Sequence, residues 1–276
     1  MDLLPTAERI LAVAGIHVPL QAFLALFFLA MARLVTAIYF VPFFGGQAVP
    51  SRVRIGLAVI LAAVLAPNLS RTAVADLNAV LLVALLAKEI MIGALLGIAC
   101  QFVFYGIQMA GILIDTQRGM NQLTFFAPQL SGPASVLGQL KLQTAIVLFL
   151  VLDGHLQYLR ALDASFREVP VLAFPSIRPG ATALLETAAR LSGNALLIGL
   201  QLAAPVLIAL FLVDIAFGML NRVASQINVH QESQPVKAMA GLGVLLLASG
   251  LLMSRMVGIL GDMMNSVTAM LHALRP

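Results

Sequence analysis

The chain has 276 residues, of which 61% are hydrophobic and only 10% are charged. Soluble domains carry roughly a quarter charged residues, so this composition excludes a soluble globular protein and indicates an integral membrane protein with several spans. The formal net charge of +4 is spread thinly and forms no basic run suited to nucleic acid. A single cysteine, Cys100, excludes a disulfide within the chain.

The N-terminal third contains apolar runs of unequal length. The first residues lack the basic region and cleavage pattern of a removable signal peptide, so we expect the first run to stay in the mature chain. Residues 10–32 can span ~30 Å of hydrocarbon, which needs about 20 helical residues, and Pro19 predicts a kink there. Runs at 34–44 and 55–66 flank a Gly-Gly turn and predict a helical hairpin.

Lys88 and Glu89 separate a short apolar run, residues 77–87, from the longest one, residues 90–114. Adjacent residues on a helix do not face each other, so we expect each charge to find a partner elsewhere or to lie at a helix end. Gly93 and Gly97 are spaced for close contact with a second helix.

Residues 111–139 combine charges, glycines and prolines with two adjacent phenylalanines. Such a segment is tolerated at membrane depth only where protein or water surrounds it, so we expect it to be non-helical and enclosed by protein. One interpretation is a movable pore plug; the other is a connector outside the membrane whose phenylalanines rest on the headgroups. In the plug interpretation, the residues of this segment hold the plug by polar contacts, seal the pore against ions with apolar side chains, or set the turns of the chain. These residues are Asp115, Gln117, Arg118, Gly119, Met120, Asn121, Phe125, Phe126 and Pro128.

The second half of the chain alternates polar and apolar stretches. Residues 153–194 are the most polar, and we expect two amphipathic pieces outside the apolar layer. Residues 195–220 form an apolar run that contains Asp214, whose charge is costly in a membrane. Asp214 either takes part in proton coupling or forms a structural pair with Arg222 or a partner chain. Residues 221–237 predict a polar loop before apolar helices at 238–253 and 256–271.

The uneven run lengths favour an all-α membrane protein of helical hairpins and broken helices that is buried against partner proteins. The four histidines are scattered, so we expect no metal site. There is no phosphate-binding loop and no nucleophile elbow. We therefore expect no enzyme activity, no catalytic residue and no cofactor.

The chain resembles the FliR/SctT family, the export-gate proteins of flagellar and injectisome type III secretion systems. The matching residues lie in collinear order along nearly the whole chain. They are Arg33, Pro42, Gly46, Val49, Pro50, Arg54, Glu89, Ile90, Gly93, Gly97, Ala110, Gly111, Asp115, Gln117, Gly119, Asp153, Gly154, His155, Ser165, Phe166, Pro170, Ala204, Pro205, Asp214, Gly218, Asn221, Arg222, Gln226, Asn228, Pro235, Val236 and Lys237.

The resemblance implies a bacterial inner-membrane subunit, one copy per machine, that acts as a single domain over residues 1–276. It implies assembly with FliP/SctR-like and FliQ/SctS-like subunits, and with an FlhB/SctU-like switch protein, into a helical gate for unfolded proteins. It makes residues 115–133 the plug. It also implies a pore-proximal loop with Asn221, Arg222, Gln226, Asn228, Pro235 and Lys237, and packing or assembly roles for Arg33, Pro42, Pro50, Arg54, Glu89, Gly93, Gly97 and Asp214.

Three alternatives stay open. Asn221 and Arg222 resemble injectisome members more than flagellar ones, which leaves flagellar use as the alternative within the family. A secondary transporter of a small solute would share the broken helices and intramembrane acids. A purely structural scaffold is the third possibility.

Overall fold

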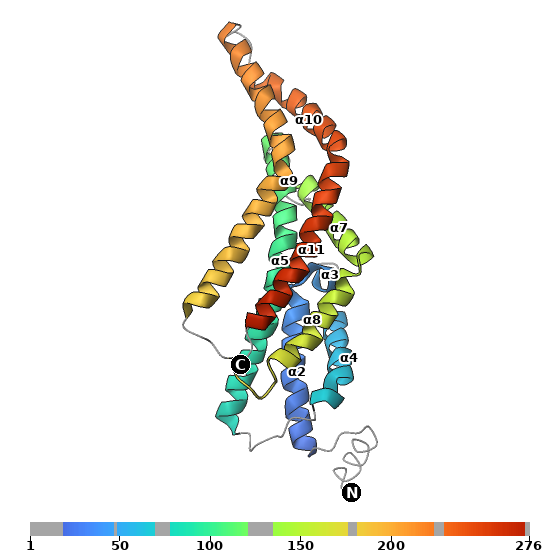
Figure 1. The fold of residues 1–276 in the computed structure, drawn as a ribbon. Coiled ribbons are helices and arrows are strands. Elements are labelled where there is room, and N and C mark those ends of the chain that lie inside the picture. The colour runs from blue at the N-terminus through green and yellow to red at the C-terminus, as the bar shows by residue number, and fades with distance from the viewer. Residues whose placement is uncertain are drawn as a thin grey trace. The chain divides into compact units, whose positions relative to one another are not determined.

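A computed structural model describes residues 19–46, 49–69, 78–120, 135–175, 181–223 and 229–273. Within these ranges the chain forms helices and no strands (Figure 1), which confirms the predicted all-α fold. Three helices are long and apolar enough to cross a membrane, and two bent helix pairs could add two spans. The helices belong to two compact units. Unit 1 comprises residues 1–101, 155–181 and 264–276, and unit 2 comprises residues 102–154 and 182–263.

Unit 1 contains the predicted hairpin. Helix α2 (Leu20–Phe40) packs against α4 (Ser51–Leu69), with the short α3 (Pro42–Gly45) between them. Pro19 lies immediately before the first turn of α2, where its missing N–H costs no helical hydrogen bond; the rest of the predicted kink, before Pro19, lies outside the described ranges. The first arm is also longer than predicted, since α2 continues through the start of the run at 34–44.

Helix α5 (Ala79–Gln117) is continuous over 39 residues. Of the two alternatives for Lys88 and Glu89, the structure therefore supports partners elsewhere and not a helix end; both side chains find partners without interrupting the backbone. The prediction of a non-helical segment over 111–139 is wrong at both ends, because α5 extends to Gln117 and α7 (Val136–Val151) begins at Val136; residues 121–134 lie outside the described ranges. Gly111 does not end the helix; it lies against the backbone of α7 at Leu137 and Gly138.

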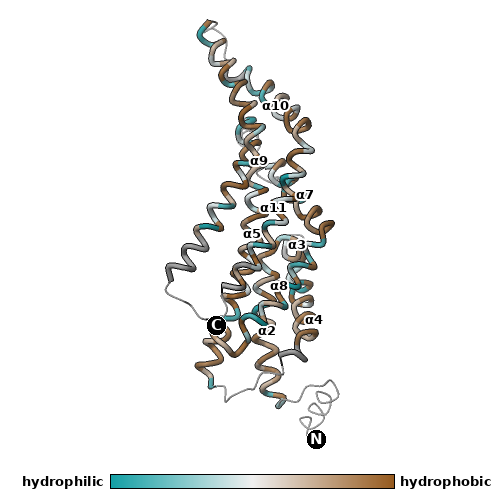
Figure 2. The backbone as a smooth tube through the Cα atoms, viewed as in Figure 1, coloured by the Kyte–Doolittle hydropathy of each residue, from teal (hydrophilic) through white to brown (hydrophobic). Residues whose placement is uncertain are grey.

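The polar stretch at 153–194 does not form a separate insertion. Helix α8 (Gly154–Glu168) is amphipathic as predicted, but the following polar residues belong to α9 (Ala181–Val223), which continues through Pro205. At 1.5 Å per residue, the 43 residues of α9 extend over about 64 Å. This is roughly twice the hydrocarbon thickness of a bilayer, so α9 is too long to lie wholly within it along the membrane normal. Figure 2 shows hydrophobic residues along much of α9.

Unit 2 ends with a bent helix pair. Helix α10 (Val229–Leu247) and α11 (Ser249–Ala273) meet at Ala248 with a bend of 63°. The predicted polar loop at 221–237 is wrong in most of its described part, because Asn221 to Val223 complete α9 and Val229 to Lys237 form the start of α10. Pro235 is the seventh residue of α10 and lies inside the helix, where it removes one i→i−4 hydrogen bond.

Candidate functional site

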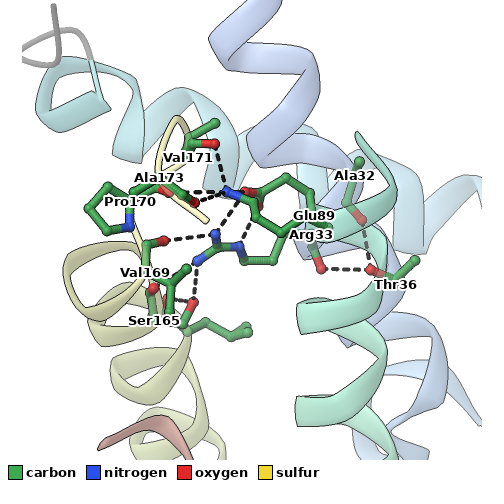
Figure 3. A network of polar contacts seen from close by, with 11 residues as sticks. Ala32, Arg33, Thr36, Glu89, Ser165, Val169, Pro170, Val171 and Ala173 are labelled. Atoms are coloured by element: carbon green, nitrogen blue, oxygen red, sulfur yellow. Dashed lines mark hydrogen bonds and ion pairs between the residues drawn. The ribbon is translucent and has the colours of Figure 1, made fainter. Parts of the chain in front are cut away.

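A buried ion-pair cluster in unit 1 joins three segments that are distant in the sequence (Figure 3). We call it the Arg33 cluster: Arg33, Lys88, Glu89, Ser165 and the carbonyls of residues 169–173. The Arg33 side chain is fully buried on α2, and its Nη2 donates to Glu89 Oε1 at 2.8 Å and to the Val169 carbonyl at 2.9 Å. Its Nη1 donates to the Ser165 carbonyl at 2.7 Å. The guanidinium therefore connects α2, α5 and the end of α8.

Arg33 also occupies an electrostatically favourable place. The last carbonyls of a helix have no intrahelical partner, and the helix C-terminus carries a partial negative charge. Helix α8 ends at Glu168, so the carbonyls of Ser165 and Val169 that bind Arg33 lie at this end. The guanidinium also lies 4.2 Å from the centre of the Phe166 ring. The arginine thus serves as the C-terminal cap of α8 while it neutralises Glu89.

The contacts of Lys88 differ in one respect from the expectation that Lys88 and Glu89 do not face each other. Its ammonium contacts the neighbouring Glu89 carboxylate at 2.7 Å, because the flexible four-carbon stem can bend toward an adjacent side chain. It also finds the more distant partners that we predicted, since it donates to the carbonyls of Pro170, Val171 and Ala173 at 3.1, 2.7 and 2.9 Å. Lys88 thus shares Glu89 Oε1 with Arg33 Nη2, while Arg33 Nε donates to Oε2, so both oxygens of Glu89 are engaged by basic side chains.

Close helix packing surrounds the Arg33 cluster. A Cβ atom added to Gly93 would collide with Thr36 and with the Arg33 carbonyl, and one added to Gly97 would lie 2.8 Å from the Ala37 carbonyl. The prediction of close contact at both glycines is confirmed: they bring α5 against α2. The Tyr158 hydroxyl, on α8, donates to that same Ala37 carbonyl at 3.0 Å.

In unit 2, Asp115 holds the two described ends of the predicted plug segment together. Its Oδ2 accepts from the Ser135 hydroxyl and from the Leu137 backbone N–H, each at 2.8 Å. The Ser135 hydroxyl in turn accepts from the Gly138 N–H at 2.8 Å, as an N-cap does. Arg118 Nη1 lies 3.6 Å from Asp115 Oδ1. We call these four residues, Asp115, Arg118, Ser135 and Leu137, the Asp115 cluster.

The chain leaves α5 through a left-handed glycine. Gly119 has φ +77°, a conformation that favours glycine over residues with a Cβ. Its N–H donates to the Thr116 carbonyl at 3.1 Å, and the Met120 N–H donates to the Asp115 carbonyl at 3.0 Å. This pair of hydrogen bonds is the Schellman motif. The predicted turn at Gly119 is therefore confirmed.

Asp214 on α9 pairs with Lys237 on α10 and accepts from Gln117 Nε2 on α5 at 3.1 Å. The suggested pair of Asp214 with Arg222 is wrong. Arg222 lies eight residues further along α9 and is exposed, whereas Lys237 reaches Asp214 from the adjoining helix. A second contact between α5 and α10 is the bond from Arg118 Nη2 to the Ala238 carbonyl at 3.0 Å.

Several other predicted site residues lie in ordinary structural positions. Pro42 begins α3, and Arg54 Nη2 donates to the carbonyls of Gly46 and Val49 at 2.8 Å each, so it holds the hairpin turn. Pro50 accepts from the Val53 N–H at 3.0 Å. Asn221, Arg222 and Pro235 are exposed. The remaining predicted residues lie outside the described ranges: Asn121, Phe125, Phe126, Pro128, Gln226 and Asn228.

Two polar residues that the structure places within the helix packing, Ser135 and Lys141, were not identified as candidates from the sequence. Ser135 had a readable signal, since a serine directly before an apolar helical run is a common N-cap. Lys141 is buried in α7 and directly precedes the apolar residues 142–152. A lone lysine beside such a run is the signal that would have found it.

Both clusters hold helices together through charges that are already engaged. Glu89 is engaged by Arg33 and Lys88, and Asp115 is engaged by a hydroxyl, a backbone N–H and Arg118. The arrangement suits the mechanical support of packed helices.

The sequence is similar to bacterial export proteins. Residues 24–263 match the family described as "Bacterial export proteins, family 1". The flagellar biosynthetic protein FliR of Pectobacterium carotovorum subsp. carotovorum is 36% identical over 223 residues, which cover 80% of this chain and 84% of that protein. FliR of Escherichia coli is 30% identical over 81% of this chain and 84% of its own length. The Yop proteins translocation protein T of Yersinia pestis is 31% identical over 67% of this chain and 70% of its own length.

Proposed function

Because the chain belongs to the family of bacterial export proteins, family 1, we propose that it is a membrane subunit of a type III protein-export gate. The observation that carries this proposal is the family match, which extends over residues 24–263 and so includes every helix that contributes to the Arg33 and Asp115 clusters. The names of the relatives refer to flagellar biosynthesis in one case and to Yop protein translocation in the other, and the family description refers to export.

In this proposal the whole chain acts as one noncatalytic domain, and the energy for export comes from another component. The gate lies in the bacterial inner membrane and contains one copy of this chain with FliP/SctR-like, FliQ/SctS-like and FlhB/SctU-like subunits. The large apolar side chains exposed along α9, such as Leu197, Phe211 and Leu212, support burial against lipid or against such partners. The packing residues Arg33, Glu89, Gly93 and Gly97 shape the surface that these partners meet.

We place the seal of the gate in the segment between α5 and α7. The Asp115 cluster fixes where this segment begins and ends, and Gly119 turns the chain out of α5. Met120, Phe125 and Phe126 supply apolar bulk, and Asn121 and Pro128 shape the segment. Asn221, Arg222, Pro235 and Lys237, with Gln226 and Asn228, lie near one mouth of the pore.

Deletion of residues 119–128 tests the seal. We expect the deletion variant to assemble with its co-expressed partner subunits and to make the membrane leaky to small ions. The matched control is the double variant Phe125→Leu and Phe126→Leu, which keeps apolar bulk and should conduct no more than the wild type. A deletion variant that assembles and still seals like the wild type would refute the plug assignment.

The second candidate is the flagellar form of the same function. The 36% identity to FliR of Pectobacterium favours it, whereas Asn221 and Arg222 favour an injectisome. Complementation separates the two: the chain is expressed in a strain that lacks its flagellar FliR and in a strain that lacks its injectisome T protein. Restored effector secretion without restored swimming supports the injectisome, and the reverse result supports the flagellum.

A further inference from the structure

One face of α10 lies on the point where the chain leaves α5, within unit 2. We call it the α10 face. Its positions recur at intervals of three and four residues, so they share one side of the helix. These positions are Gln234, Lys237, Ala238 and Gly241. Opposite them lies the exit turn of α5, residues 117–119.

The Arg118 side chain makes two contacts with the α10 face. Its Nη2 donates to the Ala238 carbonyl at 3.0 Å. Its stem lies directly on Gly241, where an added Cβ atom would be 2.7 Å from Arg118 Cδ and 2.9 Å from Arg118 Cγ. Because only a glycine lets the stem lie this close, the exit turn and α10 are fitted to each other.

Gln234 and Lys237 make two further contacts. A Cβ atom added to Gly119 would collide with Gln234 Oε1, so the Gln234 side chain lies against the left-handed glycine that turns the chain out of α5. Lys237 pairs with Asp214, which also accepts from Gln117 Nε2 at 3.1 Å. Asp214 on α9 therefore links the α10 face to the last residue of α5.

The contact is specific but incomplete. Arg118 Nε and Gln234 Oε1 are both enclosed, and neither has a hydrogen-bond partner in the described part of the chain. An enclosed polar atom without a partner costs free energy, because it has lost its hydrogen bonds to water. Arg118 Nη1 offsets little of this cost, since it lies 3.6 Å from Asp115 Oδ1, beyond normal hydrogen-bond length.

The Arg33 cluster in unit 1 shows a complete arginine contact in the same chain. Nε, Nη1 and Nη2 of Arg33 all donate, and its ion pair with Glu89 is fully buried. Asp214 is instead 33% exposed, so water reaches its pair with Lys237, and ion pairs that water reaches add little stability. The Arg33 cluster is thus built to stay closed, whereas the α10 face is held weakly enough to separate from α5.

Both ends of α10 have features that favour movement. At its C-terminal end the chain bends by 63° at Ala248 into α11, and Gly250, just beyond the bend, faces open space. Toward its N-terminal end, Pro235 removes one backbone hydrogen bond from the helix. Hinges commonly consist of a few residues at the ends of such elements.

We propose that α10 is a releasable latch on α5. The α10 face holds the exit turn while the gate is at rest, and it detaches from α5 when an exported chain passes. The inference rests on the proposed function, which places the seal of the gate directly after this turn. Detachment leaves intact the bonds of Asp115 to Ser135 and Leu137, so α5 and α7 stay together while α10 moves.

A removable cross-link tests this movement. Arg118 Cγ lies 2.9 Å from the Cβ site of Gly241, so cysteines at both positions have Cβ atoms at most about 4.4 Å apart, which allows a disulfide. The variant is Arg118→Cys with Gly241→Cys and Cys100→Ser, expressed in a strain in which the wild-type chain restores secretion. We expect diamide to form the disulfide and to lower secretion of an endogenous exported protein tenfold or more, and dithiothreitol to restore it.

Two control pairs in the same Cys100→Ser background separate the latch from general effects of cross-linking. Met109→Cys with Gly199→Cys joins α5 to α9, where Met109 Cβ lies 3.3 Å from the Cβ site of Gly199. Diamide should form this disulfide and leave secretion unchanged. Arg118→Cys with Gly243→Cys should form no disulfide, because Gly243 faces open space.

Two single variants change the strength of the latch in opposite directions. Gln234→Met replaces the amide with an apolar side chain of similar length and removes the unpaired oxygen. It should raise the thermal stability of the isolated chain in detergent and lower secretion several-fold. Lys237→Met breaks the pair with Asp214, and it should make the resting gate leaky to small ions.

Four results would overturn the inference. A wild-type chain that restores secretion in no strain lacking its own FliR or T protein refutes the proposed function, and the inference with it. Wild-type secretion that persists after the 118–241 disulfide has formed refutes the inference alone. An equal loss of secretion in the oxidised 109–199 pair would show that α10 is not the element that moves. Lower thermal stability of Gln234→Met would show that the Gln234 amide strengthens the contact.

Discussion

Glu89→Gln is the sharpest test of the Arg33 cluster. The substitution keeps the size of the side chain but removes the negative charge that contacts Arg33 and Lys88. The amide oxygen, placed at the Oε1 position, can still accept from Arg33 Nη2 and Lys88 Nζ. The new NH2 group then takes the Oε2 position and faces Arg33 Nε, donor against donor.

The expected loss is large because neither cation can escape to water. Arg33 and Glu89 are fully buried, and Lys88 is 4% exposed. Removing one partner of a buried ion pair costs about 3–5 kcal/mol, since a buried charge is left without compensation. The carbonyls of residues 165–173 still bind both cations, so we expect the value to lie toward the lower end of that range.

The assay is reversible unfolding of the purified chain in mixed micelles of increasing SDS content, followed by circular dichroism. The control is Asp163→Asn, because the Asp163–Arg167 pair has an Arg167 side chain that is 77% exposed; exposed pairs contribute about 0–1 kcal/mol. Lys88→Met should destabilise the wild type more than it destabilises Glu89→Gln, because in the second background it removes an uncompensated charge. A Glu89→Gln variant within about 1 kcal/mol of the wild type would refute this reasoning.

Three further substitutions test the packing and the turn. Gly93→Ala should lose about 1–3 kcal/mol by overpacking, because its Cβ collides with Thr36 and the Arg33 carbonyl; Gly218→Ala, which faces open space in α9, is the control in the same unfolding assay and should not lose stability. Gly119→Ala should lose about 1–2 kcal/mol because φ is +77°, and an unchanged unfolding midpoint would contradict the Schellman assignment. Asp115→Leu should accelerate hydrogen exchange at the Leu137 amide tenfold or more, because that N–H donates to Asp115 Oδ2 and leucine supplies no acceptor; equal protection in both proteins would exclude the bond.

The local features of the fold were predictable because they depend on nearby residues. The hairpin of α2 and α4 follows from a Gly-Gly turn between apolar runs, and the contact of Gly93 and Gly97 follows from their spacing. Gly119 could be placed in a turn because only glycine adopts its φ at low cost.

The partners of the charged residues could not be predicted from local patterns. Arg33 and Glu89 are 56 positions apart, and Lys237 was assigned to a loop although it lies in α10 and reaches Asp214. Lys88 and Glu89 were expected either to find partners elsewhere or to lie at a helix end, and the sequence did not decide between the two. The carbonyls at the end of α8 and the Arg33 guanidinium are those partners, and no pattern near residue 88 encodes either of them.

The wide sequence separation within the Arg33 cluster affects how the chain is made. The Val169 carbonyl that binds Arg33 is synthesised 136 positions after Arg33. At about 5–20 residues per second of synthesis, the interval between the two residues is on the order of ten seconds. During that interval the nascent chain holds two positive side chains and one negative one in its membrane helices. A ribosome that stops before α8 would therefore leave a product with a surplus buried charge, a natural target for membrane proteases.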